Sequence, residues 1–354
     1  MLLARCYTVI ANIFTCFWGC YMKRIRIAQI GTSRYSHGNS IFGSIVRQSD
    51  IFEVVGYALP EGERERFPEN MAAFAHHREM TVEEILNDPT IEAVAVETEE
   101  IYLTKYALMV ARAGKHLHME KPGGAELAPF EEMVGILKEK GLVFSLGYMY
   151  RFNPAIRALL DRVKGGELGR IYAVEAHMGG KHPLAQREWL AGVPGGMMFF
   201  LGCHLIDLIY TIMGEPLEVI PLSVSTGIDG VSTLDYGMAA FRYKDGLSFA
   251  KTCDEELGGF TRRQLVVCGE RGTVEIRPLE SPTVADKQYS LTYECLDAAW
   301  QAEWKAERSA PYERYDAMMR NFAEMVRGKE NPYSYEYELG LYRLVLRACG
   351  KDIV

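Results

Sequence analysis

The stretch Ala113–Gly124 reads Ala-Gly-Lys-His-Leu-His-Met-Glu-Lys-Pro-Gly-Gly, and it follows a run, Leu103–Ala113, that is typical of a helix. The first glycine is a good helix terminator because it takes the left-handed conformation without a Cβ clash. His116–Met119 then predicts a short strand that ends just before Lys121. In an open parallel sheet, ligands bind at the carboxyl ends of the strands. Pro122 restricts the backbone of Lys121, so we expect a lysine held at a ligand-binding edge. For this short motif alone, a solvated lysine in a surface loop is the alternative.

Short strands and helices alternate through the first part of the chain, which indicates a parallel α/β sheet of the Rossmann type. The expected strands are Ile25–Ile30, Glu53–Leu59, Ala93–Glu97, His116–Met119 and Leu142–Leu146. The expected helices are 38–48, Thr81–Leu86, Leu103–Ala113 and Leu127–Lys140. We therefore expect residues 22–147 to form a dinucleotide-binding domain.

From Tyr148 the pattern changes, because strand-like runs follow one another without helices between them. A helix over Pro154–Val163, a strand over Arg170–His177 and a helix over Leu205–Met213 come first. Strands are then expected at 217–225, 235–243, 246–253, 263–268 and 272–276, with an Asp-Gly hairpin signal before 246. This predicts an α+β domain over 148–310 with a large, mostly antiparallel sheet. Two helices within 311–354, near 312–327 and 335–348, are expected to return to the first domain.

Length and composition limit the possible functions. At 354 residues, two domains are more plausible than one. The formal net charge of −8 argues against nucleic acid as the main partner. The eight cysteines are scattered, without Cys-x-x-Cys or a Cys/His metal spacing. We therefore expect no metal site and a reducing, cytoplasmic location.

Residues 1–21 are apolar and aromatic, with Arg5 as their single charge. An uncleaved signal anchor is one interpretation, since Lys23 and Arg24 follow directly. The other is that Met22 is the true start and that 1–21 form an extension outside the fold. We expect the second, and hence no membrane association.

The turn after the first expected strand has the setting of a Gly-x-Gly-x-x-Gly dinucleotide fingerprint. The first glycine is kept, whereas serines stand at the second and third positions. Serine still offers a hydroxyl and an N–H, and the following helix N-terminus can hold phosphate. The alternative is an ordinary turn whose Ser and Thr cap the helix. The candidate cofactor contacts here are Gly31, Thr32, Ser33, Tyr35 and Ser36.

The second expected strand usually ends in a carboxylate that holds the ribose hydroxyls. This chain has Leu59 there, followed by Pro60 and Glu61. Either Glu61 substitutes from a shifted loop, or ribose is recognised poorly or differently. Arg64 and Arg66 are candidates for a 2′-phosphate, although a solvated helix face suits them too. The choice between NAD and NADP stays open.

Four motifs in order resemble the glucose–fructose oxidoreductase / inositol dehydrogenase (Gfo/Idh/MocA) family from about Met22 onward. They are Ala-Gly-Lys-His-(x)3-Glu-Lys-Pro at 113–122, Arg-Phe-Asn-Pro at 151–154, Gly-Glu-Leu-Gly at 166–169 and Gly-Cys-His-(x)2-Asp at 202–207. The resemblance implies a two-domain NAD(P)-dependent oxidoreductase for a sugar, polyol or related carbonyl compound. With it we expect a small-molecule substrate and a homo-oligomer formed through the C-terminal sheet.

The resemblance also implies roles for individual residues. Lys121 would approach the nicotinamide ribose and the substrate oxygen, with Glu120 and Thr98 as further cofactor contacts. His204 matches the family's catalytic histidine. Asp207 lies at i+3 on nearly the same helical face and could orient the imidazole. The alternative is that His204 caps the helix and Asp207 favours its N-terminal dipole. The candidate substrate contacts are Arg151, Asn153, Lys181 and His182.

Four positions depart from the family pattern: Ser33, Leu59, Leu103 and Phe200. The last replaces an aspartate four residues before His204, so that carboxylate cannot relay a proton. Its apolar ring would tend to lower the pKa of Lys121 or His204 by desolvation. These departures leave two alternatives to a dehydrogenase: a binding or regulatory protein with degraded catalysis, and a redox-assisted lyase or glycosidase.

Overall fold

The N-terminal part of the chain forms a five-stranded parallel sheet in the order β2-β1-β3-β4-β5. The computed structural model describes residues 23–283, 285, 287–297 and 303–353, so the interpretation of residues 1–21 lies outside the described residues. The strands are β1 (Ile25–Ile30), β2 (Phe52–Ala58), β3 (Ala93–Val96), β4 (His116–Met119) and β5 (Phe144–Leu146). The parallel α/β sheet predicted from the sequence is confirmed, with β1 and β4 at their predicted bounds.

Helices connect these strands. The central strand β3 is buried at every residue and β4 at all but His116, as expected for a parallel sheet covered on both faces. The helices are α2 (Gly38–Arg47), α3 (Glu63–Arg66), α4 (Val82–Asn87), α5 (Glu100–Arg112) and α6 (Leu127–Glu139). Two glycines stand where a larger residue would clash or be strained. A Cβ on Gly31 would lie 2.4 Å from Cγ2 of Thr98. Gly114, at φ 74°, follows α5 as the sequence predicted.

The second sheet has eight strands in the order β15-β14-β11-β10-β6-β9-β8-β7. Neighbouring strands are antiparallel except β6 and β9, so the prediction of a mostly antiparallel sheet is confirmed. The strands are β6 (Ile171–Gly179), β7 (Glu218–Pro221), β8 (Tyr236–Tyr243), β9 (Gly246–Cys253), β10 (Gln264–Gly269), β11 (Gly272–Ile276), β14 (Leu291–Leu296) and β15 (Lys305–Arg308). A two-stranded ribbon pairs β12 (Ser281–Pro282) with β13 (Gln288–Tyr289).

The sequence did not predict strands β12, β13, β14 and β15 or the short helix α8 (Leu184–Trp189). Strand β15 is Lys-Ala-Glu-Arg and is exposed along its whole length. Such a charged edge strand protects a sheet against pairing with another chain. It carries no apolar alternation by which a sequence pattern could indicate it.

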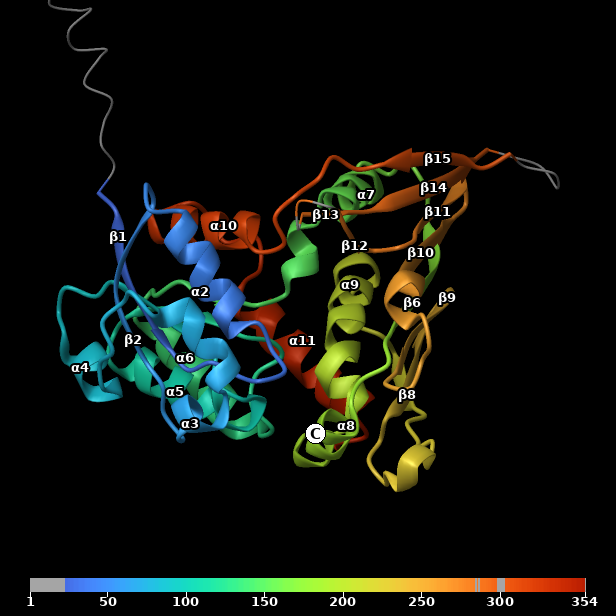
Figure 1. Cartoon of the computed structure of the whole chain (residues 1–354). Helices are drawn as coiled ribbons and strands as arrows, with labels where there is room; N and C mark the ends of the chain where they lie inside the picture. Colours follow the sequence, from blue (N-terminus) through green and yellow to red (C-terminus); the bar gives the residue numbers. More distant parts are fainter. Residues whose placement is uncertain (1–22, 284, 286, 298–302, 354) are drawn as a thin grey trace, which may run out of the picture.

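Helices α7 (Pro154–Lys164) and α9 (Cys203–Met213) lie on the side of the sheet that faces the N-terminal domain (Figure 1). A π-helical turn, Met198–Gly202, runs directly into α9. Helix α11 (Tyr335–Ala348) contacts both α6 and α9, and α10 (Asp316–Val326) packs on α2. The C-terminal helices therefore tie the two sheets together, and the space between the sheets is where a site can form.

Candidate active site

A cavity of about 350 Å³ lies between the two domains. Lys121, at the end of β4, and Tyr35, on the turn after β1, line it from the N-terminal domain. His204, in the first turn of α9, and His182, after β6, line it from the C-terminal domain. The structure thus brings together four of the candidate residues, including both members of the expected acid–base pair.

Lys121 is almost wholly buried, with 2% of its surface exposed. Its Nζ donates to the backbone carbonyl of Phe200 at 3.0 Å and lies 4.6 Å from the centre of that ring. Burial lowers the pKa of the ammonium, but the buried Cys203 and Glu120 groups beside it raise that pKa by more. We expected an apolar Phe200 to lower the pKa of Lys121 or His204; the pKa of Lys121 is instead raised by the buried acidic groups around it, whereas that of His204 is lowered.

His204 lies in the first turn of α9 and is 3% exposed. Its ring packs edge-on against Tyr148 and Tyr150, with centroids 5.9 and 5.1 Å away. Burial, and then the positive charge of Lys121, lower the pKa of the imidazole well below its usual value. The ring is therefore neutral near pH 7. Its Nδ1 has no hydrogen-bond partner among the described residues and remains free to accept a proton.

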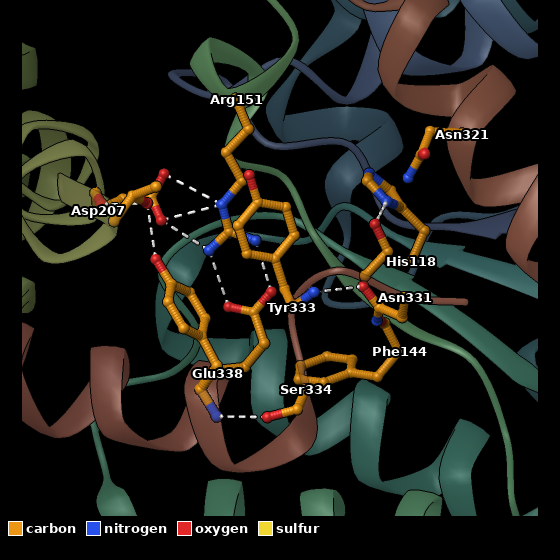
Figure 2. Close-up of polar contacts among 12 residues, drawn as sticks. His118, Phe144, Arg151, Asp207, Asn321, Asn331, Tyr333, Ser334 and Glu338 are labelled. Carbon is orange, nitrogen blue, oxygen red and sulfur yellow. Dashed lines mark hydrogen bonds and ion pairs between the residues drawn. The ribbon is translucent and has the colours of Figure 1, made fainter. Parts of the chain in front are cut away.

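Asp207 does not orient His204 in the structure. Its carboxylate instead accepts hydrogen bonds from Arg151, at 2.9 Å from Nε and 2.7 Å from Nη2. The other side of the same guanidinium binds Glu338 of α11 at 2.6 and 2.9 Å (Figure 2). Tyr333 lies over the guanidinium at 3.8 Å. The two motif residues therefore form a buried ion cluster that holds α11 against α9, away from the cavity.

Two further candidate substrate residues are engaged elsewhere. The side chain of Asn153 caps α7, accepting from Ala155 N at 2.9 Å, and donates to Leu279 O at 2.9 Å. Lys181 forms an ion pair with Glu255 and does not line the cavity. The family motif therefore supplies structural contacts at Asn153, in place of the substrate contact we expected from it.

The turn between β1 and α2 has hydrogen-bonding groups without partners, and these suit a phosphate. The hydroxyls of Ser33 and Ser36 are buried and have no partner among the described residues. The first residue of α2 is Gly38, and the preceding His37 makes no side-chain cap. Helix N-terminal N–H groups attract anions. The residues of this turn therefore fit a dinucleotide's phosphates.

A carboxylate does lie against this turn, but it belongs to Glu63 of α3. Its Oε2 accepts from the backbone N–H of Thr32 at 2.9 Å, and its Oε1 has no partner among the described residues. Burial raises the pKa of Glu63 to about 8. Glu61 instead binds Lys105 at 2.5 Å and Tyr106 at 2.7 Å. Glu63 was not predicted from the sequence, because a ribose carboxylate is expected at the end of β2 or in the loop directly after it, and Glu63 lies in the helix that follows.

Three buried carboxyl groups surround the base of Lys121: Glu97, Glu100 and Glu120. Glu97 and Glu120 follow neighbouring parallel strands at the same level. Burial raises the pKa of all three, to about 7 for Glu100. They therefore hold protons in a range where exposed carboxyl groups have lost them. Thr98, between them in the chain, is buried and packs against Gly31.

The far wall of the cavity consists of residues that the sequence analysis did not select: Tyr150, Arg263, Glu280 and Arg314. Tyr150 precedes the family motif at 151–154 by one residue, so the motif pointed to the right segment. The other three are far apart in the sequence and carry no local signal.

Among the described residues, no group of three or more His, Cys, Asp or Glu side chains is placed to hold a metal ion. The described helices are all too short or too polar to cross a bilayer.

The chain matches two family models. Residues 25–148 match the oxidoreductase family with an NAD-binding Rossmann fold, and 156–275 match the Gfo/Idh/MocA C-terminal domain. The uncharacterized oxidoreductase YhhX of Escherichia coli is 32% identical over 155 residues, which cover 43% of this chain and 44% of YhhX. The 1,5-anhydro-D-fructose reductase of Ensifer adhaerens is 27% identical, over 63% of this chain and 72% of the reductase.

Among solved structures, levoglucosan dehydrogenase in complex with NADH and levoglucosan has a TM-score of 0.77 at 16% identity, covering 93% of this chain and 98% of that one. At this identity the likeness supports the fold alone. The fold is one that holds a nicotinamide cofactor in that structure. The first family model covers the domain of the parallel sheet, and the second covers most of the domain that follows it. The protein therefore belongs to the Gfo/Idh/MocA oxidoreductase family.

Proposed function

We propose that the protein is an NAD(P)-dependent oxidoreductase that moves a hydride between the nicotinamide and a CH–OH carbon of a small sugar, polyol or related carbonyl compound. One observation carries this proposal: Lys121 and His204 come from different domains and line the same cavity. The family match and the phosphate-binding character of the β1–α2 turn support it.

Each part of the chain would then have a separate task. Ser33 and Ser36, with the N-terminus of α2, would hold the phosphates. Glu63, rather than Glu61, accepts a hydrogen bond from that turn and would contact the ribose. The nicotinamide, when bound, supplies the hydride acceptor or donor. Thr98 and Glu120, at the ends of adjacent strands, would border its ring.

Alcohol oxidation also releases a proton, and the cavity offers a group for it. The Nδ1 of His204 is free and the ring is neutral, so it can accept the hydroxyl proton. The charged Lys121 would stabilise the negative charge that develops on the substrate oxygen. Because both groups are buried, water screens this interaction little.

The direct experiment is to titrate the purified protein with NADH and NADPH while following nicotinamide fluorescence. A polyol and sugar panel then tests for hydride transfer at the nicotinamide absorbance band. We expect saturable binding of at least one cofactor and turnover with at least one alcohol. No cofactor binding at millimolar concentration would move the protein to the class of binding or regulatory proteins.

We also propose that the protein forms a homo-oligomer through the sheet face turned away from α9. Apolar side chains on that face are exposed, at 56% for Leu247 and 41% for Ile220. Phe249 lies beside Ala240 on the same face and is only half-buried. Analytical ultracentrifugation should give a dimer or larger, and Leu247→Glu should shift it toward the monomer. A monomer at every concentration would contradict the proposal.

A further inference from the structure

We propose that the substrate carries an anionic group, a carboxylate or a phosphate, which binds Arg263 and Arg314 at the far wall of the cavity. This inference rests on the proposed function and adds the substrate class to it. The neutral sugars and polyols that the family resemblance suggests would not use these two side chains fully.

The charges at the far wall do not balance. Among the described residues that line the cavity, Glu280 is the only one with a carboxylate side chain. It binds Arg314 at 2.6 Å and Arg263 at 3.2 Å, and it also accepts from the Tyr150 hydroxyl at 2.7 Å. Two guanidinium groups therefore share one carboxylate, which leaves a surplus positive charge. Lys121 adds a second cation on the near wall.

The surplus charge is held in a desolvated place. The side chains of Arg263 and Arg314 are 11% and 22% exposed, and that of Glu280 is 1% exposed. The Nε and Nη1 of Arg263 have acceptors, whereas its Nη2 has no hydrogen-bond partner among the described residues. A planar guanidinium with a free donor is well suited to bind a carboxylate or a phosphate. A neutral substrate would leave that charge buried and uncompensated, which is costly.

The same positive charges lower the pKa of two neighbouring histidines. Burial lowers the pKa of His37 well below its usual value, and the charges of Arg314, Lys121 and Arg263 lower it further. His204 is affected in the same way. Both rings are therefore neutral near pH 7, so that the fixed cations alone give the cavity its positive sign. Such a cavity attracts anions and repels cations.

The anion would sit at a defined distance from the chemistry. Tyr150 separates the two ends: its ring packs edge-on against His204 at 5.1 Å, and its hydroxyl reaches Glu280. The acidic group is therefore about one tyrosine side chain away from the reacting carbon. A short chain fits this span, such as a sugar acid or a sugar phosphate with the acid at one end and the reacting hydroxyl several bonds away.

A purely structural role for the two arginines is the competing explanation. Neutralising a buried carboxylate requires one cation, and Arg314 already binds both oxygens of Glu280, through Nε at 2.8 Å and Nη2 at 2.6 Å. Arg263 would then be redundant in charge, yet it is almost fully buried. Arg263 lines the cavity and its Nη2 has no partner among the described residues, which favours a ligand.

Matched ligand pairs test the inference. Calorimetric titrations of the full chain, with and without NADPH, would compare D-gluconate with D-glucitol and D-glucose 6-phosphate with D-glucose. In each pair the carbon chain is the same, and the members differ in one terminal group, which is anionic in one and a neutral hydroxyl in the other. We expect at least one acid to bind about tenfold or more tightly than its neutral partner, a difference of about 1.4 kcal/mol. The two pairs distinguish a carboxylate from a phosphate.

Variants connect the preference to the arginines. Arg314→Gln should abolish the preference, since Glu280 keeps its bonds to Arg263 and Tyr150. The control, Arg242→Gln, removes an exposed arginine that pairs with Glu218 at the sheet edge, and should leave the preference unchanged. Circular dichroism shows whether each variant is folded. If Arg314→Gln does not fold, the comparison of acid and neutral ligands on the wild-type protein still tests the inference.

Three results would overturn the inference: equal or tighter binding of both neutral partners, an unchanged preference in folded Arg314→Gln, or no binding of either acid at millimolar concentration. Failure of the proposed function is a separate result, because it would show as absent nicotinamide binding in the fluorescence titration. A protein that binds nicotinamide and prefers the neutral partners would refute only the substrate class.

Discussion

The Lys121 ammonium donates to the backbone carbonyl of Phe200 at 3.0 Å, and the Phe200 ring lies beside it at 4.6 Å. Lys121 follows strand β4 of the N-terminal sheet, and Phe200 belongs to the π-helical turn before α9. The same ring packs edge-on against Trp189 at 5.4 Å. The second domain therefore sets the position of the lysine, at the place where the family pattern usually has an aspartate.

Phe200→Asp should move the pH–rate profile to higher pH. A carboxylate beside Lys121 and His204 favours their charged forms and raises the pKa of both. Steady-state rates over pH, with any substrate found, measure the shift. Phe200→Leu is the matched control, because it changes the shape of the side chain without adding charge. An equal shift in the leucine variant would show that packing, rather than charge, controls the profile.

Lys121→Ala and His204→Ala should each slow the hydride step by about 10²-fold or more, the usual scale for a positioned acid–base group. Cofactor affinity should fall much less for His204→Ala, since that ring lies on the opposite domain from the β1–α2 turn. Stopped-flow absorbance of the nicotinamide separates the two effects. Wild-type rates in both variants would mean that neither residue takes part in the chemistry.

Arg151→Met should destabilise the protein by about 3–5 kcal/mol, because it leaves the buried carboxylates of Asp207 and Glu338 without their cation. Denaturant unfolding followed by tryptophan fluorescence measures the change. Arg157→Met, on the exposed face of α7, is the control and should have little effect. If Arg151→Met is as stable as the control, the ion cluster does not stabilise α11.

Glu63→Gln should stabilise the protein at high pH and have less effect at low pH. Burial raises the pKa of Glu63 to about 8 in the folded state, against 4.5 for an ordinary glutamate. The folded state therefore binds more protons between these values, and wild-type stability falls as pH rises through that window. The amide of glutamine does not titrate, and its oxygen can still accept from Thr32.

The expected gain near pH 8, relative to near pH 5, is on the order of 1–3 kcal/mol, since one pKa unit is worth about 1.4 kcal/mol. Urea unfolding at both pH values measures it. Glu65→Gln, exposed on the same helix, is the control and should show no such trend. A wild-type protein whose stability rises steadily between the two pH values would contradict the prediction.

Leu59→Asp should favour NAD(H) over NADP(H), because it places a carboxylate at the end of β2, where the 2′-hydroxyl of the ribose is usually bound. A 2′-phosphate would be repelled there. The ratio of the two dissociation constants, from nicotinamide fluorescence, measures the effect. Leu59→Asn offers the same size without the charge. An unchanged ratio would place the ribose elsewhere, with Glu63 as the first residue to test.

The sequence by itself determined the local elements and their order. The β-branched stretch Ile25–Ile30 predicted β1 at its observed bounds. Glycine at 114 predicted the end of α5, and the stretch after it predicted β4 at its observed bounds. These features depend on neighbouring residues, which a single sequence contains. The position of Lys121 after β4 follows from the same local pattern, since the carboxyl ends of parallel strands always share one edge of the sheet.

Only the tertiary structure decided which side chains meet. Spacing placed Asp207 on the same helical face as His204, but its partner is Arg151, which a second carboxylate from α11 also binds. The cavity wall of Arg263, Glu280 and Arg314 likewise joins segments that no local pattern connects. Charged side chains in a buried space take the partners that neutralise them, and those partners come from whichever elements the packing of the two sheets brings within reach.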